Sequence, residues 1–337
     1  MEGYSLKGLL YIGKKRIMRD NPYYHTFAQY CRDNFGRRLY RVALDAGFTC
    51  PNRDGTAGTG GCIFCSAAGS GEYALEFHGQ ELTMDDIQPV LGERAKKQAQ
   101  PGDFIGYFQS FSNTYAQAEK LRRIYRAVLA NEIFAGISIA TRPDCVGRDV
   151  LELFSELKAE FPDKFIWVEL GLQTMHEKNA EFINRGYGLD TFEKCVRGLQ
   201  EAGIPVIVHV IIGLPGETEE MMYRTTEYLN GLKIDGIKLH LLHILKGTKL
   251  YEMYIAQETC ESGPEEGSPV ISPMTFEEYT DIVCGCLERL SPEIVVHRLT
   301  GDGDKENLVA PLWSLEKGKV INSIRHKMKE RGQNNKT

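Results

Sequence analysis

The sequence has no long hydrophobic run, no short repeat and no low-complexity segment. No apolar stretch approaches the ~18 residues of a membrane-spanning helix, so no membrane span is expected. Residues 1–20 lack the sustained apolar core and the small-residue cleavage site of a secretory signal. These absences predict a cytoplasmic globular protein, whose 337 residues suffice for one large α/β domain with extensions or for two modest domains.

Acidic residues are scarce at both ends of the chain. Residues 1–41 contain nine Lys or Arg and three Asp or Glu, and residues 317–337 contain seven Lys or Arg and one Glu. The overall net charge is nevertheless −6, so two basic ends flank an acidic body. The ends are either solvated helix faces with a basic tail or, if they meet in space, a nucleic-acid patch.

The one cluster of cysteines in the sequence has three members, one fewer than a closed four-cysteine metal site needs. Cys50, Cys62 and Cys65 form a Cys-x11-Cys-x2-Cys loop, rich in glycine, directly after a strand predicted within residues 39–50. Thiolates suit iron–sulfur clusters or zinc, and three of them would leave one iron of a cubane cluster open to another ligand. The remaining cysteines have the pattern of ordinary buried thiols: Cys31, Cys145, Cys195, Cys260, Cys284 and Cys286.

Two other cysteine chemistries lack their sequence signatures. No histidine is followed by Glu two positions later, as the zinc deaminases require. The Cys62–Cys65 pair follows a glycine and precedes SAAGSGE, whereas a thioredoxin-type pair normally opens a helix. Spacing alone leaves a three-thiolate zinc site and accidental spacing as alternatives to a cluster.

Strands and helices alternate six times between residues 40 and 250. The alternation predicts parallel βαβ units with right-handed crossovers. Six units are too few for a closed eight-fold barrel, so we expect an α/β fold with a partial (β/α)6 barrel, or alternatively a doubly wound sheet. One helix is predicted over 84–99. The expected organisation is an N-terminal extension (1–39), the barrel (40–250) and a C-terminal extension (251–337) ending in a basic helix.

Five segments stand at the predicted strand ends. They are ATRPD (140–144), VELGLQT (168–174), INRGYG (183–188), GIPVIVHVIIGLPGET (203–218) and KLHLLHILKGTKLY (238–251). In this order they resemble the radical S-adenosylmethionine (SAM) superfamily, and more closely the domain shared by the Elongator catalytic subunit and oxygen-independent coproporphyrinogen oxidase. With RLTGDG (298–303) and LVAPLW (308–313), the whole chain is similar to a bacterial family of Elongator-like radical SAM proteins.

The resemblance implies a [4Fe–4S] cluster on Cys50, Cys62 and Cys65, with SAM on the open iron and a reductase, flavodoxin or ferredoxin as electron donor. It implies that Glu169, Gln173 and Arg185 hold the ribose and the amino-acid end of SAM. The alternative for Glu169 is a buried salt bridge to Arg142 or Arg185.

Further cofactor contacts follow from the same resemblance. The turn that begins at Gly213 would present backbone groups to adenine, or is a glycine turn with Thr218 as a helix cap. The family's Gly-Gly-Glu is absent from the second strand, where YFQSFSNTY (107–115) stands, and Gln109, Ser110 and Asn113 are the candidate replacements. The remaining predicted contacts are Thr141, Arg142, His209 and His243. For His240 and His243, a core position and a substrate-facing position are both open.

The Elongator likeness implies modification of the wobble uridine of tRNA. One version converts a carboxymethylaminomethyl group to aminomethyl by breaking the N–CH2 bond. Only about 85 residues follow residue 250, so we expect no acetyltransferase domain like the one that follows the Elongator radical domain. The alternatives are a radical SAM oxidoreductase acting on a small molecule and a non-enzymatic metal-binding module.

Overall fold

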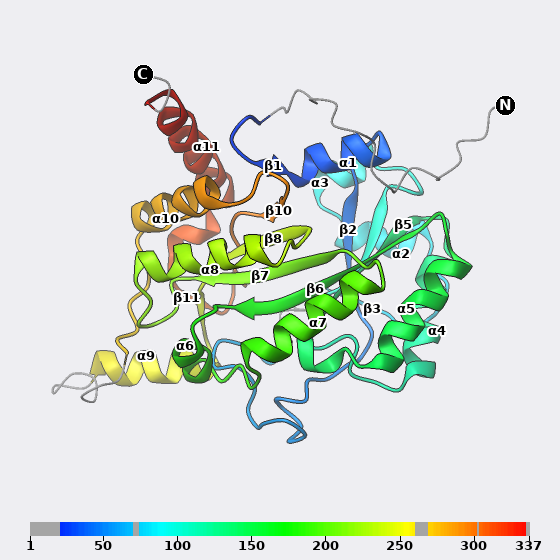
Figure 1. The fold of residues 1–337 in the computed structure, drawn as a ribbon, viewed down its shortest axis with the longest axis horizontal. Helices are drawn as coiled ribbons and strands as arrows, with labels where there is room; N and C mark the ends of the chain where they lie inside the picture. The colour runs from blue at the N-terminus through cyan, green and yellow to red at the C-terminus, as the bar shows by residue number, and fades with distance from the viewer. Residues whose placement is uncertain (1–20, 70–73, 260–268, 302, 335–337) are drawn as a thin grey trace.

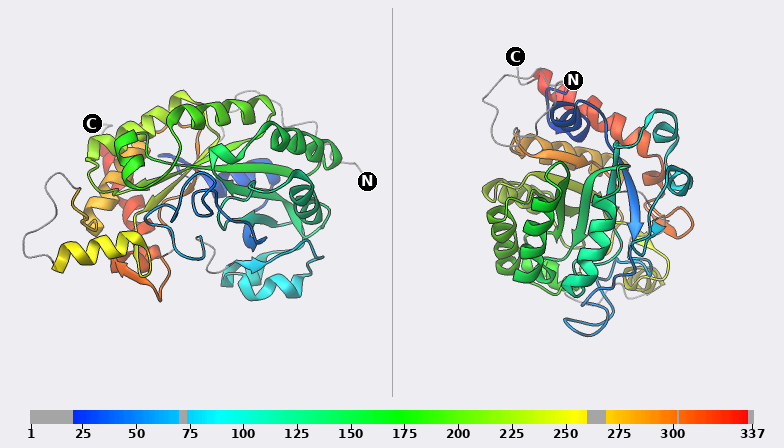
Figure 2. Two further views of the ribbon diagram at one scale, coloured as in Figure 1. Left: turned by 90° about the horizontal axis from the view of Figure 1, so that it is seen from below. Right: turned by 90° about the vertical axis from the view of Figure 1, so that its right-hand side faces the viewer.

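The computed structural model describes residues 21–69, 74–259, 269–301 and 303–334. Within them, nine strands form one parallel sheet in the order β1-β10-β8-β7-β6-β5-β4-β2-β3. The sheet curls into a half-barrel (Figures 1 and 2), which confirms the partial barrel. Its six central strands are β2 (Tyr40–Asp45), β4 (Phe104–Phe108), β5 (Phe134–Thr141), β6 (Phe165–Gln173), β7 (Val206–Ile212) and β8 (Gly236–Leu241).

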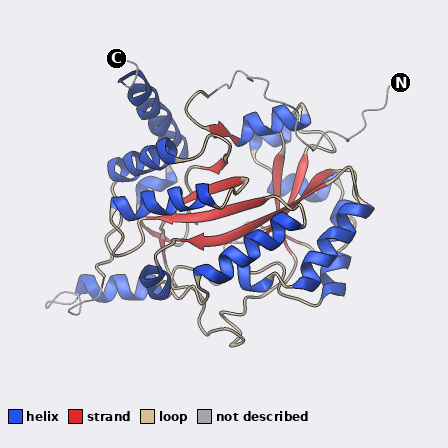
Figure 3. Ribbon diagram, in the orientation of Figure 1, coloured by secondary structure: helices blue, strands red, loops and turns tan. Residues whose placement is uncertain are grey.

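Helices cover the outer face of this sheet (Figure 3). The crossover helices are α4 (Ala118–Leu129), α5 (Arg148–Glu160), α7 (Leu189–Glu201) and α8 (Glu219–Gly231), with the shorter η2 (Pro143–Cys145) and α6 (Glu177–Phe182). Their apolar faces bury the outward side chains of the strands, such as Val208 and Ile237, in one continuous core. Thr218 caps α8 by accepting a hydrogen bond from the Met221 N–H, as the sequence suggested.

The single helix predicted over 84–99 is wrong. The segment instead forms α2 (Met84–Ile87), the 3-10 turn η1 (Gln88–Val90) and α3 (Glu93–Gln98). Pro89 lies at the start of η1, and proline lacks the N–H that would continue the helix and clashes with the preceding turn. Gly92 then begins α3 as its N-cap.

Both extensions add to the barrel. β1 (His25–Thr26) and β10 (Val295–Arg298) extend the sheet beyond β8, and β3 (Leu75–Glu76) extends it beyond β2. In the C-terminal extension, β11 (Leu308–Ala310) pairs antiparallel with β9 (Ile244–Leu245). The other elements there are α9 (Lys249–Thr259), α10 (Phe276–Arg289), η3 (Leu312–Leu315) and α11 (Lys317–Asn334).

Helix α1 (Phe27–Phe35) closes one end of the barrel. Its Phe27 and Tyr30 rings lie 6.1 and 5.9 Å from the ring of Trp167, near the start of β6. Because parallel strands start at the same edge, this contact places the helix at the amino ends of the strands. The opposite end, where the carboxyl ends lie, remains for the site. In the described part of the chain, no helix is long and apolar enough to cross a bilayer.

Candidate active site

A cavity of about 450 Å³ lies at the carboxyl ends of the strands. Its wall contains side chains from all six central strands or from the loops that follow them. All but three of the predicted site residues line it: Cys50, Cys62, Cys65, Gln109, Thr141, Arg142, Glu169, Gln173, Arg185, His209 and His243. Ser110, Asn113 and Gly213 are the exceptions. The structure therefore brings most of the predicted residues together at this edge, and the roles assigned to them stay predictions.

The cysteine loop is held from inside by Asn52. Its side chain is 1% exposed, donates to the Asn184 carbonyl at 2.6 Å and lies with Nδ2 3.8 Å from the Cys62 sulfur. Gly58 is required here, because a Cβ at that position would lie 2.3 Å from Asn52 Oδ1. Arg53 holds the other arm by donating to the carbonyls of Cys65 and Ser66.

The three thiols of the loop are close enough to affect one another's ionisation. Burial and the neighbouring thiols of Cys65 and Cys50 raise the pKa of Cys62 to about 12, although the positive charge of Arg142 acts to lower it. Three thiolates in this cavity would repel one another unless a cationic centre joined them, so the donor set fits an iron–sulfur cluster. A single zinc ion needs its ligands to converge on one point, and no three His, Cys, Asp or Glu side chains do so among the described residues. In a cubane cluster each thiolate instead binds a different iron.

Glu169 is the centre of a buried polar network inside the barrel. Its carboxylate accepts hydrogen bonds from Ser138 Oγ and His209 Nε2, each at 2.6 Å, and forms an ion pair with Lys238. Lys238 also donates to the Tyr107 hydroxyl at 3.0 Å. Burial alone would raise the pKa of Glu169, but the Lys238 ammonium and His209 hold it well below its usual range. The buried salt bridge is thus present, with Lys238 rather than Arg142 or Arg185 as partner.

Comparisons with known proteins agree with this geometry. Residues 53–229 match the radical SAM superfamily model, and residues 234–330 match the radical SAM C-terminal domain. The chain belongs to the radical SAM superfamily. It is 41% identical to protein YtqA of Bacillus subtilis over 94% of this chain and 95% of that one.

Two further relatives bear on the Elongator likeness. The chain is 31% identical to the tRNA uridine(34) acetyltransferase of Methanocaldococcus jannaschii over 40% of this chain and 25% of that protein. The solved structure of Methanocaldococcus infernus Elp3 superimposes with a TM-score of 0.61 at 16% identity, covering 88% of this chain and 64% of that one. The chain thus spans less than two thirds of that Elp3 structure, and the likeness shows the shared fold.

As a radical SAM enzyme, the chain takes a [4Fe–4S] cluster and SAM as cofactors. Arg142 and Arg185, predicted near SAM, already have many partners. Arg185 is 1% exposed and donates to the carbonyls of Leu172, Thr174 and Tyr187, and it pairs with Glu177. These contacts hold the loop after β6, so the geometry favours a positioning role.

The guanidinium of Arg142 is likewise already bonded to protein groups. It pairs with Asp144 at 2.7 Å and donates to the Arg185 carbonyl at 2.8 Å. The guanidinium carbons of Arg142 and Arg185 lie 4.7 and 4.9 Å from the centre of the Tyr187 ring. Cation–π contacts of this kind add to the ion pairs and stiffen the wall of the cavity.

Gln173 stands at a strained point of this wall. The strand register shifts between Gly171 and Gln173, and Gln173 has a φ of 66°. Residues other than glycine rarely adopt this left-handed conformation, and those that do are concentrated at functional sites. Thr141, by contrast, uses its hydroxyl in a 2.6 Å hydrogen bond with Thr114.

Ser110 and Gly213, two of the predicted residues outside the cavity, have other surroundings. Ser110 is 1% exposed, and its hydroxyl has no partner among the described residues. Gly213 has a φ of 89°, and its N–H points to the Met222 sulfur at 3.3 Å. A Cβ at Gly213 would lie 2.7 Å from the Met274 sulfur, so the turn is packed against protein on that side.

Sequence reasoning missed Lys238, Ser138 and Arg41 as interior residues. The signal was present in the strand alternation, because side chains two apart share a face. Lys238 and His240 are two apart on β8, with the core residues Ile237, Leu239 and Leu241 on the other face. A strand whose inward positions are Lys and His predicts a polar barrel interior.

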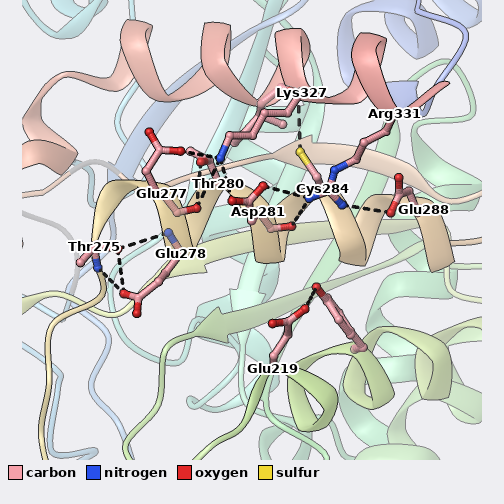
Figure 4. A network of polar contacts seen from close by, with 12 residues as sticks. Glu219, Thr275, Glu277, Glu278, Thr280, Asp281, Cys284, Glu288, Lys327 and Arg331 are labelled. Atoms are coloured by element: carbon pink, nitrogen blue, oxygen red, sulfur yellow. Dashed lines mark hydrogen bonds and ion pairs between the residues drawn. The ribbon is translucent and has the colours of Figure 1, made fainter. Parts of the chain in front are cut away.

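Part of the positive charge of the basic C-terminal helix is neutralised by the protein itself. Figure 4 shows Lys327 and Arg331 of α11 pointing at carboxylates of α10. Lys327 pairs with Glu277 and Asp281 at 2.7 and 2.9 Å, and Arg331 pairs with Asp281 and Glu288. For Lys327 and Arg331, a role in holding α11 against α10 is therefore favoured over contact with a nucleic acid. Residues 1–20 of the other basic end, and Cys260, lie outside the described residues.

Proposed function

We propose that Cys50, Cys62 and Cys65 hold the [4Fe–4S] cluster and that SAM occupies the adjoining part of the cavity against Gln109, Gln173 and His209. When bound, these cofactors supply a 5′-deoxyadenosyl radical. The single observation that carries the proposal is the common cavity, which joins the three thiols to the polar barrel interior. The protein's own residues shape that cavity and keep it apart from the amino end of the barrel, where α1 packs.

We further propose that the substrate is a tRNA carrying a side chain on its wobble uridine, in the cytoplasm, with a flavodoxin, ferredoxin or reductase as electron donor. The similarity to a tRNA uridine(34) acetyltransferase supports the nucleoside. In the version favoured here, the CH2–NH unit beside the carboxylate of a carboxymethylaminomethyl side chain would lose a hydrogen atom, a proton and an electron, with the bound cofactors taking up the hydrogen atom and the electron. Water would then cleave the resulting imine, which leaves the aminomethyl group and releases the two carboxymethyl carbons as glyoxylate. A target base must leave its stack to reach such a cavity.

The competing function is oxidation of a small metabolite by the same cofactors. The pairing of α11 with α10 favours it, because that pairing uses basic charge that an RNA would otherwise contact. Salt dependence separates the two: tRNA binding weakens steeply as salt rises, whereas binding of a small neutral molecule does not.

The experiment is anaerobic reconstitution with iron, sulfide, SAM and dithionite, followed by addition of tRNA from a strain that lacks the gene. We expect 5′-deoxyadenosine to form and the wobble-uridine mass to change. Cys62→Ala should lose the cluster absorbance and both products, while the matched Cys195→Ala on α7 keeps them. Formation of 5′-deoxyadenosine with no change in any tRNA would reject the tRNA substrate and retain the enzyme class. Full cluster absorbance in Cys62→Ala would reject the ligand assignment.

A further inference from the structure

His209 presents one edge of its ring to the cavity. It lies on β7 between Val208 and Val210, whose side chains belong to the outer core under the helices (Figure 3). Successive residues of a strand face opposite ways, so the His209 ring points into the half-barrel, where it lines the cavity. Its side chain is 18% exposed, whereas that of Glu169 beside it is 0% exposed. A group bound in the cavity can therefore reach this ring.

The two nitrogens of the ring have different surroundings. Nε2 lies 2.6 Å from the Glu169 carboxylate, which also pairs with Lys238. A carboxylate only accepts hydrogen bonds, so Nε2 carries a hydrogen and the neutral ring has its lone pair on Nδ1. Nδ1 has no hydrogen-bond partner among the described residues and is not one of their buried unpaired atoms. The basic nitrogen is therefore the one that is open to the cavity.

The ring of His209 is suited to take up a proton. Burial and the Lys238 charge lower its pKa below the ordinary value of 6.5, although the hydrogen bond to Glu169 acts to raise it. The ring is therefore neutral at pH 7, as a base must be before it reacts. The charged or titratable side chains around it are those of Glu169, Lys238, His240 and Arg298. Once Nδ1 is protonated, the Glu169 carboxylate stabilises the imidazolium, as a carboxylate does beside the histidine base of hydrolytic enzymes.

The neighbouring His240 lacks this arrangement. Its ring centre lies 5.0 Å from that of His209, and it also lines the cavity. Its Nε2, however, is buried without a hydrogen-bond partner among the described residues, so no carboxylate at that nitrogen would stabilise its protonated form. Burial, His209 and the Arg298 charge hold the pKa of His240 well below its usual range. Of these two adjacent rings, the geometry favours His209 as a base.

The proposed reaction leaves one proton without an acceptor. Between the amine and the imine, the CH2 carbon loses a hydrogen atom, the nitrogen loses a proton, and one electron leaves. The bound cofactors take up the hydrogen atom and the electron. The proton needs a base that is neutral at the working pH and within hydrogen-bond reach of the amine.

We propose that His209 is this base and that its Nδ1 takes the proton from the neutral amine of the carboxymethylaminomethyl group. The proposal rests on the proposed function. The N–H bond of the substrate breaks, and a new N–H bond forms at Nδ1. The electron pair left on the nitrogen and the unpaired electron on the carbon together supply the C=N bond and the one electron that leaves, so atoms and electrons balance.

The first test follows the hydrogen and the product separately on the reconstituted full chain. The probe is an anticodon stem-loop whose carboxymethylaminomethyl group carries deuterium in the CH2 beside the carboxylate. His209→Gln keeps a side-chain N–H for Glu169 but has no basic nitrogen. We expect deuterium still to reach 5′-deoxyadenosine, while the aminomethyluridine formed per deuterated 5′-deoxyadenosine falls at least about tenfold. Weaker binding of SAM or of the RNA does not lower this ratio, because it counts only turnovers in which the hydrogen has left.

The second test needs no turnover. Nitrogen-15 NMR of the cofactor-free full chain, labelled at histidine, should show His209 at pH 7 as a neutral ring with its hydrogen on Nε2. The signal is assigned by its absence from His209→Gln, or from His209→Asn if the first variant does not fold. An imidazolium at pH 7, or a neutral ring with its hydrogen on Nδ1, would overturn the assignment of the base.

His326→Gln is the matched loss of a histidine. His326 is an exposed residue of α11 that lies away from the cavity wall and pairs with Glu330. Its replacement should leave the product ratio and the affinities for SAM and the stem-loop within about twofold of wild type.

Each outcome decides one point. An unchanged product ratio in His209→Gln overturns the base while the tRNA function stands. Weaker binding of SAM with an unchanged ratio assigns the ring edge to the cofactor and likewise overturns the base. A wild-type enzyme that forms 5′-deoxyadenosine but alters no RNA overturns the proposed function, and this inference with it.

Discussion

Arg41 on β2 and His297 on β10 lie within hydrogen-bonding distance, 2.8 Å from Nη2 to Nδ1, although 256 positions separate them in the sequence. β8, β7, β6, β5 and β4 stand between the two strands in the sheet. The contact therefore spans the open side of the half-barrel. Phe27 of α1 packs against both partners, with its ring centre 4.7 Å from that of His297. One hydrogen bond thus ties the first barrel strand to the C-terminal extension.

Arg41→Met should destabilise the protein by about 1–3 kcal/mol, because it leaves His297 Nδ1 buried without its donor. The measurement is urea unfolding of the cofactor-free protein. Lys97→Met, at an exposed position of α3, serves as the matched loss of a cation. Equal stability of Arg41→Met and wild type would show that this contact does not hold the barrel closed.

The ion pair between Lys238 and Glu169 predicts strong coupling between the two positions. Lys238→Met should cost about 3–5 kcal/mol, since it leaves a carboxylate buried without its cation. Adding Glu169→Gln to that variant should restore part of the loss, because the uncompensated charge is then gone. A double-mutant cycle from denaturant unfolding gives the coupling energy. Strict additivity of the two substitutions would contradict a direct pair.

The outer layers of this protein are more predictable from sequence than its interior. The alternation of strands and helices, the cavity at the strand ends and the cap at Thr218 all follow from local patterns. The contact of Arg41 with His297 does not, because only the closed topology brings the two together. Lys238 was missed for another reason: its immediate neighbours on β8 are apolar, and the face that it shares with His240 was not considered separately.

Arg185 illustrates the corresponding limit for the site. Because arginine suits a carboxylate ligand, the sequence correctly singles out Arg185 as a residue that lines the cavity. In the structure, however, the N–H donors of Arg185 are already directed to the carbonyls of Leu172 and Thr174. Which donors remain for a ligand depends on backbone groups that sequence patterns do not position. The same applies to Glu169, whose partners come from three other strands.

Glu217 predicts a pH dependence of stability. It contacts the Thr174 hydroxyl, and burial raises its pKa from 4.5 to about 7. The folded protein therefore keeps a proton that the unfolded chain releases near pH 4.5. Its contribution to stability is fully present below pH 4.5 and falls as the pH rises to about 7.

Glu217→Gln should flatten this part of the stability profile and stabilise the cofactor-free protein above pH 7 by up to roughly 3 kcal/mol. Thermal unfolding between pH 4.5 and 8 provides the measurement. Glu220→Gln, at an exposed position in the first turn of α8, should leave the slope unchanged. A slope that persists in Glu217→Gln would assign it to other groups.

The position of Asn52 beside Cys62 predicts that its amide changes the reduction potential of the cluster, and this effect can be separated from its effect on the order of the loop. Its Nδ2 lies 3.8 Å from the Cys62 sulfur, and an N–H directed at a ligating sulfur favours the reduced cluster. With Cys62 as a ligand, Asn52→Ala should lower the midpoint potential by about 60 mV, the equivalent of a tenfold change for one electron.

Asn184→Ala is the matched control, because it loses the side-chain bond to the Gly61 carbonyl at 2.7 Å yet keeps the backbone carbonyl that Asn52 contacts. A redox titration followed by electron paramagnetic resonance, normalised to iron content, distinguishes them. If both variants shift the potential equally, loop order and not the amide donor is responsible.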